Sequence, residues 1–320
     1  MTAPRVSIIT PSFNQAQYLE ETMRSVLEQG YPNLEYIVVD GGSTDGSVEI
    51  IQKYADRLAW WVSEKDNGQA EAINKGFARA TGEIVAWINS DDYYLPGAIA
   101  EAVRALEEQP ECGMVFGDVV SIDGTGQPVN VMTYGDWGLE GLMQFNIVGQ
   151  PGVFMRRAVL ERAGYLDLSY HFMLDHHLWL RVAQQALICY VPSQWAAARF
   201  HAGAKNVAQA AKFGQEAKRI AQWMPTQPGL AETYNRLKNR IWAGAYRMDG
   251  RYLLDGGLPG PALRAYLRGL LRYPPAVLPE TRRVLFAFAS LFFNVDRLRS
   301  SYLERRRKRV ADRLGKTGSK

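Results

Sequence analysis

The sequence VSIITPSFN at residues 6–14 decides how the chain folds. Residues 6–10 are a run rich in β-branched residues, which predicts a buried parallel strand. Further strand-like runs lie at 35–40, 58–62 and 83–88. Each of the four runs is followed by a helical pattern, at 17–29, 47–54, 69–80 and 96–108. Strands that alternate with helices of this length predict βαβ units and a mostly parallel sheet with right-handed crossovers.

The remaining sequence changes character twice. Residues 111–205 mix predicted strands with two predicted helices; the strands are 113–120, 129–134, 152–156, 187–191 and 195–200, and the helices are 158–163 and 174–185. From residue 207 the pattern is helical, with Pro and Gly breaks between 210–223, 230–246, 261–273 and 281–309. We therefore expect one α/β domain over 1–205, with halves at about 1–110 and 111–205, and a helical region over 206–320.

The charge of the chain is distributed unevenly. Residues 281–320 carry twelve Lys or Arg and three Asp or Glu, a net charge of +9, so the other 280 residues carry −5. A mildly acidic body argues against nucleic-acid binding, and a basic tail indicates an electrostatic attachment point. The apolar run 284–293 is too short to span a bilayer. The tail therefore predicts either a helix lying on an anionic membrane surface or a helix packed on the body.

Cysteine content and the first residues bear on location. Two cysteines, Cys112 and Cys189, cannot form a disulfide framework and offer no C-x-x-C metal pair. They predict buried thiols in a reducing compartment such as the cytoplasm. Residues 1–10 lack the charged segment and the long apolar segment of a signal peptide. We expect a cytoplasmic protein, peripheral on the inner face of the membrane if the tail binds lipid.

Polar and acidic residues follow all four predicted parallel strands, at 10–14, 40–46, 63–68 and 89–92. In a parallel sheet these ends meet at one edge, where ligands bind. Clustered carboxylates repel unless a cation or a ligand offsets them. The adjacent pair Asp91 and Asp92 suits Mg²⁺, which takes one or two carboxylates and completes its shell with water and phosphate oxygens. Alternatively, Asp92 caps the helix that begins near Pro96.

Three motifs in this order, VSIITPSFN at 6–14, VDGGSTDGS at 39–47 and NSDD at 89–92, resemble those of the family 2 glycosyltransferases. The resemblance covers roughly residues 4–205. It implies a GT-A-like mixed sheet, mostly parallel and flanked by helices. It also implies metal-dependent, inverting transfer of a sugar from a nucleotide-diphosphate donor, with a UDP-type donor favoured. The acceptor would be a hydroxyl of a saccharide or lipid-linked molecule, in the synthesis of cell-surface polysaccharide or glycan.

The resemblance also implies roles for single residues. Those near the nucleotide would be Thr10, Pro11 and Asn14 at the base and ribose, Asp40 on a uracil-type ring, Asp66 near the same base, and Asn74 or Lys75 near the phosphates. Asn89-Ser90-Asp91 occupies the place of the family's D-x-D motif. Asp91 would contact a divalent cation, Mg²⁺ or Mn²⁺. Asn89 would make a neutral contact to ribose or water, and Asp92 would be a second ligand or an orienting neighbour.

The stretch HFMLDHHLWLR at 171–181 resembles the family's E-D-x-x-L-W-L-R stretch, with Leu174 where an acid is common. Asp175 falls on the proposed catalytic base, which takes a proton from the acceptor hydroxyl. One base without an enzyme nucleophile implies inversion. Asp175 could instead cap a helix over 178–185. His176 and His177 do not predict zinc, because no Cys or third His lies at ligand spacing; we expect one to face the acceptor.

Two further segments resemble family features. RFHAGAKN at 199–206 resembles R-x-H-x-x-x-x-S, with Asn206 in place of the serine. His201 would then approach the metal or the diphosphate, or it is a lone interfacial histidine. GQPG at 149–152 resembles the acceptor-side loop, so Gln150 would contact the acceptor.

Two other functions stay open from the sequence. A sugar nucleotidyltransferase also combines a nucleotide-binding sheet with Mg²⁺, but residues 10–14 lack the Gly-rich phosphate loop with a basic residue that it would use. A catalytically inactive, membrane-associated family member would account for Asn89, Leu174 and the basic tail.

Overall fold

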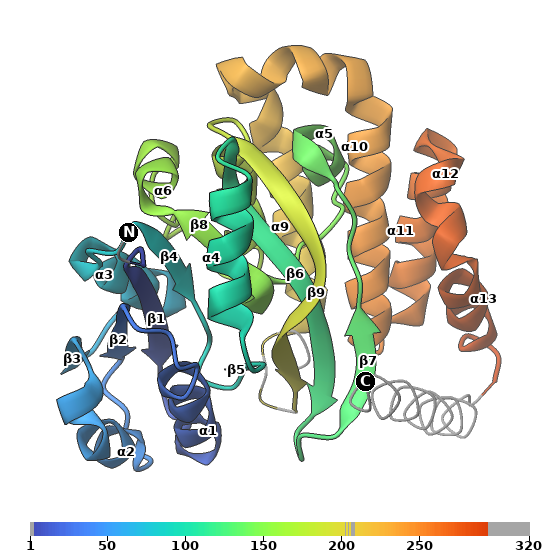
Figure 1. Ribbon diagram of the computed structural model, residues 1–320. Coiled ribbons are helices and arrows are strands. Elements are labelled where there is room, and N and C mark those ends of the chain that lie inside the picture. Colours follow the sequence, from blue (N-terminus) through green and yellow to red (C-terminus); the bar gives the residue numbers. More distant parts are fainter. Residues whose placement is uncertain (1–2, 202, 204, 206–208, 294–320) are drawn as a thin grey trace, which may run out of the picture. The chain divides into compact units, whose positions relative to one another are not determined.

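The computed structural model describes residues 3–201, 203, 205 and 209–293 (Figure 1). Two compact units divide the chain. The first comprises Met1–Ser121, Val131–Gly138 and Val148–Arg199, and the second comprises Ile122–Asn130, Leu139–Ile147 and Phe200–Lys320. The main division therefore falls between residues 199 and 200, and two short segments from the middle of the chain belong to the helical unit.

The four expected parallel strands of the first unit are present as β1 (Val6–Ser12), β2 (Leu34–Asp40), β3 (Trp60–Ser63) and β4 (Ile84–Trp87). β1 pairs in parallel with β2 and β4, and β2 pairs in parallel with β3. The register sets Ser12 opposite Asp40 and Asp40 opposite Ser63. The carboxyl ends of β1, β2 and β3 are thus level at one edge of the sheet, as the sequence predicts.

Antiparallel strands extend this sheet and make it mixed. β8 (Val153–Arg156) pairs with both β4 and β6 (Cys112–Asp123), and β5 (Tyr93–Tyr94) pairs with β9 (Leu187–Phe200). The strand order is β3-β2-β1-β4-β8-β6-β9-β5, and β7 (Pro128–Met132) pairs with β6. The prediction of two strands over 187–200 is wrong, because β9 continues through Pro192. Proline removes one donor, but its backbone angle suits an extended chain.

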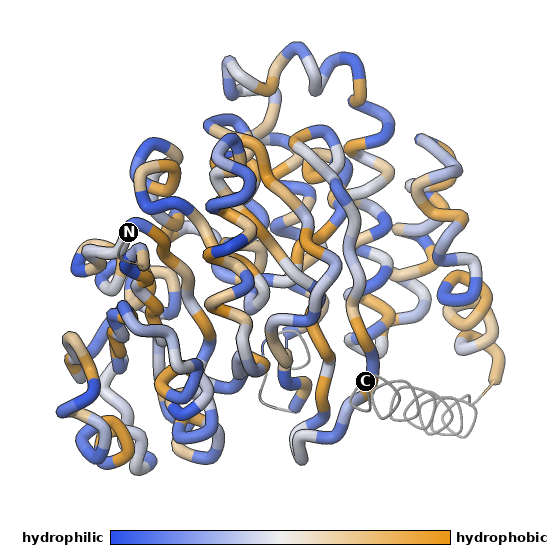
Figure 2. Tube along the Cα trace, viewed as in Figure 1, coloured by the Kyte–Doolittle hydropathy of each residue, from blue (hydrophilic) through white to orange (hydrophobic). Residues whose placement is uncertain are grey.

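The helices of the first unit match the predicted ones to within a few residues, except that the helix expected over 174–185 ends earlier, at Val182. They are α1 (Ala16–Leu27), α2 (Ser47–Lys53), α3 (Gln69–Arg79), α4 (Ala98–Glu108), α6 (Arg157–Ala163) and α7 (Leu174–Val182), with short 3-10 turns at Ala55–Arg57 and Gln150–Gly152. Figure 2 shows apolar residues concentrated along the strands between them. Gly76 permits the approach of α3 to the sheet, because a Cβ there would lie 2.5 Å from Ile9 Cγ2. Close packing of α3 on β1 fixes the loops that follow both.

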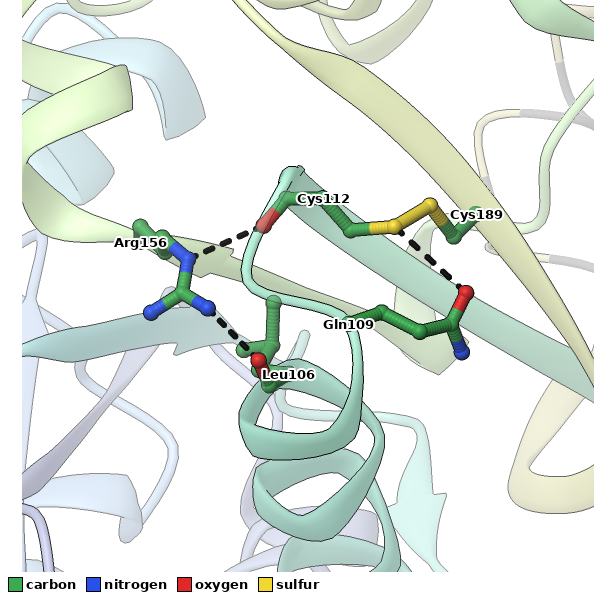
Figure 3. The surroundings of a disulfide bond; sticks show 5 residues. All are labelled: Leu106, Gln109, Cys112, Arg156 and Cys189. Atoms are coloured by element: carbon green, nitrogen blue, oxygen red, sulfur yellow. Dashed lines mark hydrogen bonds between the residues drawn. A yellow bond between two sulfur atoms is a disulfide. The ribbon is translucent and has the colours of Figure 1, made fainter.

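Cys112 and Cys189 form a disulfide, so the prediction of two free thiols is wrong (Figure 3). The residues are 77 positions apart, but β6 and β9 are neighbours in the sheet and bring their Cα atoms to 6.0 Å. Arg156 fixes the same corner by donating to the carbonyl oxygens of Cys112 at 2.9 Å and Leu106 at 2.6 Å. The argument from free thiols for a reducing compartment falls with this bond.

The second unit is mainly helical. Its helices are α9 (Ala210–Trp223), α10 (Pro228–Asp255), α11 (Pro259–Arg272), α12 (Pro274–Val277) and α13 (Thr281–Ala289), with 3-10 turns at Met224–Thr226 and Leu278–Glu280; α5 (Gly138–Met143), which the sequence did not predict, lies where the units meet along the chain. α10 packs on α9 and α11. α10 continues beyond the predicted 230–246 to Asp255. Gly250 in this extension allows α11 to pack closely, because a Cβ there would be 3.0 Å from the Tyr266 ring.

The end of the chain is described only in part. The helix predicted over 281–309 is helical as α13 to Ala289, and residues 294–309 lie outside the described residues. Among the described residues, none of the helices is both long and apolar enough to cross a bilayer.

Candidate active site

The turn at residues 40–43 follows β2 and is held by the side-chain carboxylate of Asp40. Asp40 is fully buried. Its Oδ2 accepts from the backbone N–H groups of Gly42 at 3.0 Å and Ser43 at 2.8 Å and from Ser63 Oγ at 2.7 Å, and its Oδ1 accepts from Ser43 Oγ at 2.5 Å. The sequence pointed to Asp40 but not to the serines that bind it. The predicted contact of Asp40 with a uracil-type ring stays a prediction.

The loops after β1 and β3 converge on the same turn. Asn14, in the left-handed region at φ 50°, donates its backbone N–H to Ser43 Oγ at 2.8 Å and accepts from the backbone N–H of Thr44 at 2.9 Å. Asp66 lies against Gly41, since a Cβ on Gly41 would be 2.9 Å from Asp66 Oδ2. The structure therefore brings Asn14, Asp40 and Asp66 together, as the resemblance implies for the nucleotide-binding edge.

The last residues of β1 divide between the core and this edge. Thr10 is fully buried, and its Oγ1 lies 2.9 Å from the hydroxyl of Tyr36, so its side chain serves the interior. Pro11 is also buried. Ser12, opposite Asp40, has a buried hydroxyl with no hydrogen-bond partner among the described residues. A buried orphaned donor is costly, and a ligand oxygen at the sheet edge would satisfy it.

Asn89 is the centre of an amide network after β4. It accepts from Gln69 Nε2 at 2.7 Å and donates to Gln150 Oε1 at 3.1 Å and to Asp92 Oδ2 at 3.3 Å. Gln150 in turn donates to the Trp87 carbonyl at 2.7 Å. This network gives Asn89 and Gln150 internal partners, and their predicted contacts to ribose and acceptor stay predictions. Gln69 had no signal in the sequence.

Asp91 and Asp92 lie in one turn, which Arg199 of β9 holds. The Arg199 backbone N–H donates to Asp92 Oδ1 at 2.9 Å, and its Nε donates to the Asp91 carbonyl at 3.1 Å. Its guanidinium also pairs with Glu21 of α1 and lies 4.6 Å from the Tyr18 ring. The capping interpretation of Asp92 is wrong, because α4 begins at Ala98 after the N-cap Gly97. In the sequence, Arg199 is only the first residue of the RFHAGAKN stretch, and no pattern predicts its contacts with the two aspartates.

The electrostatics of this turn fit a cation. The Asp92 side chain is only 6% exposed. Burial, followed by the neighbouring charge of Asp91, raises the pKa of Asp92 well above its usual range. A hard divalent cation would offset both effects. The described residues contain no group of three or more His, Cys, Asp or Glu arranged to hold a metal. If a cation binds at this turn, Asp91 and Asp92 would supply one or two carboxylates, and a diphosphate and water would supply the other ligands.

Asp175 occupies the first turn of α7. The helix begins at Leu174 after the N-cap Met173, so the interpretation of Asp175 as a cap of a helix starting at 178 is wrong. Its Oδ1 accepts from the backbone N–H of His176 at 2.7 Å. One turn later, Trp179 stacks on Trp87 of β4, with centroids 5.2 Å apart. Asp175 thus belongs to the helix that packs against the strand preceding Asn89.

Three further residues, Asn74, Lys75 and His201, were predicted near the phosphates or the metal. The Asn74 amide is used by the Leu166 backbone, donating to its carbonyl at 2.8 Å and accepting from its N–H at 2.9 Å. Lys75 pairs with Glu64 at 2.6 Å. His201 belongs to the second unit, and Asn206 lies outside the described residues. Their predicted roles near the phosphates and the metal stay predictions.

His176 and His177 are both buried in α7. His177 stacks on the Tyr170 ring with centroids 4.2 Å apart. The burial of His177 is therefore accounted for by aromatic packing. The expected contact of one histidine with the acceptor stays a prediction.

A mixed α/β sheet with polar and acidic residues at the ends of its parallel strands defines an α/β protein whose ligand site is expected at that edge. The comparisons with known proteins name the family. The model of glycosyl transferase family 2 matches residues 7–155. TuaG of Bacillus subtilis, named for glycosyl transfer in teichuronic acid biosynthesis, is 30% identical over 193 residues, which cover 58% of this chain and 75% of TuaG. The chain belongs to glycosyltransferase family 2 and is a glycosyltransferase.

Solved structures share the fold. Staphylococcus aureus TarS 1–349, in complex with UDP-GlcNAc, aligns with a TM-score of 0.59 at 18% identity, over 87% of this chain and 92% of that chain. The mannosyltransferase PcManGT of Pyrobaculum calidifontis, in complex with GDP-Man and Mn²⁺, aligns with a TM-score of 0.52 at 21% identity, over 95% of this chain and 85% of that chain. The expected GT-A-like fold is confirmed.

Proposed function

We propose that the protein is a metal-dependent, inverting glycosyltransferase. It would move a sugar from a nucleotide-diphosphate donor to a hydroxyl of a saccharide or lipid-linked acceptor in polysaccharide synthesis. The observation that carries the proposal is the Asp91–Asp92 turn, in which a buried carboxylate lies beside a second one at the end of β4. A protein keeps such a pair at a cost, and a cation together with a diphosphate would offset that cost.

The donor side of the proposal rests on the level strand ends. Asn14, Asp40 and Asp66 converge there, and Ser12 leaves a buried hydroxyl for a ligand oxygen. The relatives' complexes with UDP-GlcNAc and GDP-Man support a nucleotide-sugar donor. We favour a UDP-type donor, because the resemblance places Asp40 at a uracil-type ring.

Asp91 would hold the Mg²⁺ or Mn²⁺ ion, with Asp92 as second ligand or orienting neighbour and His201 as a further candidate. The cation, when bound, stabilises the negative charge of the departing diphosphate. Arg199 contributes by holding the backbone carbonyl of Asp91 and one carboxylate oxygen of Asp92.

Asp175 would take the proton from the acceptor hydroxyl. The acceptor oxygen forms a bond to the anomeric carbon while the bond to the diphosphate oxygen breaks, and the diphosphate leaves with the electron pair. The carboxylate of Asp175 receives the hydroxyl proton. A single displacement from the face opposite the nucleotide inverts the anomeric centre.

The location proposed with this activity is the inner face of a membrane, reached through the basic residues 281–320. It no longer rests on free thiols, because Cys112 and Cys189 are bonded. It rests on the net charge of +9 over those residues.

The test begins with binding. UDP-GlcNAc or GDP-mannose with Mn²⁺ should raise the melting temperature of the protein, because a ligand of the native state stabilises it. Stabilisation by no nucleotide sugar would favour an inactive family member. Release of pyrophosphate from a nucleoside triphosphate and a sugar phosphate would favour a nucleotidyltransferase.

The second part tests the base. Asp175→Asn should lower kcat about 10³-fold and leave donor binding unchanged, since general-base catalysis typically contributes 10²–10⁴-fold. Glu161→Gln is the control, because this half-exposed carboxylate on α6 only pairs with Arg157. An Asp175→Asn variant as active as the Glu161→Gln variant would remove Asp175 from the mechanism.

A further inference from the structure

Helix α11 presents a face of alternating basic and apolar side chains. Arg264, Leu267, Arg268, Leu271 and Arg272 recur at intervals of three and four residues, so they lie on one side of the helix. All five are exposed, and Leu271 is 87% exposed. The opposite side of α11, with Ala262, Ala265 and Tyr266, is buried.

Helix α13 and the residues after it continue this pattern. Leu285 is 62% exposed and Phe292 is 66% exposed, and Phe288 and Phe293 are exposed as well. Ala287 on the inner side is buried with Leu254 and Ala262. α13 contacts α11, and Leu291 lies at Gly260 near the start of α11. Figure 2 shows the hydrophobic colouring along α13. One side of α13 therefore packs in the hydrophobic core, and the large apolar side chains on its other side are exposed to solvent.

All charge that this part of the chain exposes is positive. Residues 258–293 contain five arginines and one acid, Glu280. Glu280 is buried and accepts from Arg251 and, at 2.9 Å, from the Tyr266 hydroxyl. Arg283 pairs with Asp255 at 2.9 Å. The described residues provide no carboxylate for the other four, which are Arg264, Arg268, Arg272 and Arg282.

We propose that α11 and α13 form a membrane-binding face, defined by Arg264, Leu267, Arg268, Leu271, Arg272, Arg282, Leu285, Phe288 and Phe292. Its partner is an anionic lipid bilayer. Arginine stems lie along an apolar surface while their guanidinium groups reach lipid phosphates, and leucine and phenylalanine enter the boundary between headgroups and acyl chains. Exposed apolar residues and positive charge without exposed acid complement such a surface.

Two observations favour a bilayer over an acidic protein. The apolar part of the face consists of Leu and Phe side chains, which offer no hydrogen-bonding group for specific recognition. The sequence beyond the described residues also continues with the same charge, since residues 294–320 hold ten Lys or Arg and three acids. The inference is independent of the transfer chemistry proposed above.

The experiment uses the full chain and two kinds of vesicle, one of phosphatidylcholine and one of phosphatidylcholine mixed with phosphatidylglycerol. Flotation should show binding to the anionic vesicles, weakened by high salt because charge attraction is screened. Arg268→Gln with Arg272→Gln should weaken binding about 25-fold, at about fivefold for each basic residue. Phe288→Ser with Phe292→Ser should weaken it by at least about tenfold.

Matched controls come from the first unit. Arg104→Gln removes an arginine whose side chain is 68% exposed, and Leu187→Ser removes a leucine that is 60% exposed; both should bind as the unchanged protein does. A further variant replaces the basic residues at 305–309 with glutamine. Binding lost in that variant but unchanged in the α11 and α13 variants would assign attachment to the tail alone and overturn the proposal.

Other outcomes overturn it as well. They are equal binding to neutral and anionic vesicles, or no binding to either. Melting temperature and donor binding should be unchanged in the α11 and α13 variants, because the replaced side chains are exposed. A variant that loses vesicle binding and keeps donor binding separates this inference from the proposed function.

Discussion

Two acidic turns at the same edge of the sheet differ in how their carboxylates are satisfied. Asp40, after β2, is fully buried and accepts four hydrogen bonds from Gly42, Ser43 and Ser63. Asp92, after β4, accepts one from the Arg199 backbone and one from Asn89, and it lies beside Asp91. The protein thus solvates the first carboxylate with its own donors and leaves the second pair dependent on a partner of positive charge.

This difference indicates that the aspartates at the sheet edge have different roles. Asp40 organises the Gly42–Ser43 turn, on which Asn14 also rests. Asp91 and Asp92 are held in place by Arg199, which donates to the backbone carbonyl of Asp91 and to one carboxylate oxygen of Asp92. A pattern of acids at strand ends therefore finds the edge where chemistry occurs, but it does not separate the positioning acid from the cation-binding pair.

The largest expected effect follows from Asp91→Asn. Transfer should fall about 10³-fold, because cation-assisted departure of the diphosphate is worth several kcal/mol. Mn²⁺ should no longer strengthen donor binding in calorimetry, and the melting temperature without ligand should be unchanged or raised, because the repulsion between Asp91 and Asp92 is removed. Asp56→Asn, which alters an exposed acid in the 3-10 turn before β3, serves as the control. Unchanged activity in Asp91→Asn would remove the metal from the mechanism.

The next prediction compares the two turns directly. Asp40→Asn should lower the free energy of unfolding by about 2 kcal/mol, because the amide Nδ2 faces N–H and O–H donors that were satisfied. Asp92→Asn should lose much less stability without metal, since the removal of a buried charge beside Asp91 offsets the one donor that the new amide would face. Urea denaturation of both variants measures the two effects. If Asp92→Asn loses as much stability as Asp40→Asn, the contrast between the turns is wrong.

Arg199 is expected to have an intermediate effect. Arg199→Gln should weaken Mn²⁺ binding in the presence of UDP about tenfold, because the Asp91 carbonyl and Glu21 lose a common donor. Arg156→Gln is the matched control, since Arg156 is also partly buried and holds the carbonyls of Leu106 and Cys112 outside the acidic turns. Both variants should lose stability, and only Arg199→Gln should lose cation affinity. Equal Mn²⁺ affinity in the two would reduce Arg199 to a structural residue.

The sequence predicts the edge of the sheet better than the contacts within it. The alternation of β-branched runs and helices sets the direction of β1 to β4, and direction alone puts Asp40, Asp66 and Asp91 at the same edge of the sheet. The partners of these residues come from distant elements. Ser63 reaches Asp40 from β3, and Arg199 reaches Asp91 from β9, across 108 positions.

The disulfide was missed for the same reason. Local patterns give the strands that carry Cys112 and Cys189, but the pairing order β6-β9 is a property of the assembled sheet. Thr10 and Asn74 show partners that the motif does not indicate, and their predicted nucleotide contacts stay predictions. Both stand where the family motif implies a nucleotide contact, and both side chains bind within the protein, to Tyr36 and to the Leu166 backbone.

The smallest expected effect tests the neutral residue between the two turns. Asn89→Asp restores the first acid of the D-x-D motif but replaces a donor to Asp92 and to Gln150 Oε1 with an acceptor. Without metal the variant should lose about 1 kcal/mol of stability, through an unpaired acceptor and a third carboxylate in the turn.

Mn²⁺ should then stabilise the Asn89→Asp variant more than the unchanged protein, because added negative charge raises the attraction for a cation. Asn74→Asp makes the same chemical change where the amide donates to the Leu166 carbonyl, outside the acidic turns. Its loss of stability should not be relieved by Mn²⁺. Thermal melts of both variants with and without Mn²⁺ decide the point. Equal relief in both, or in neither, would mean that Asn89 does not border the cation.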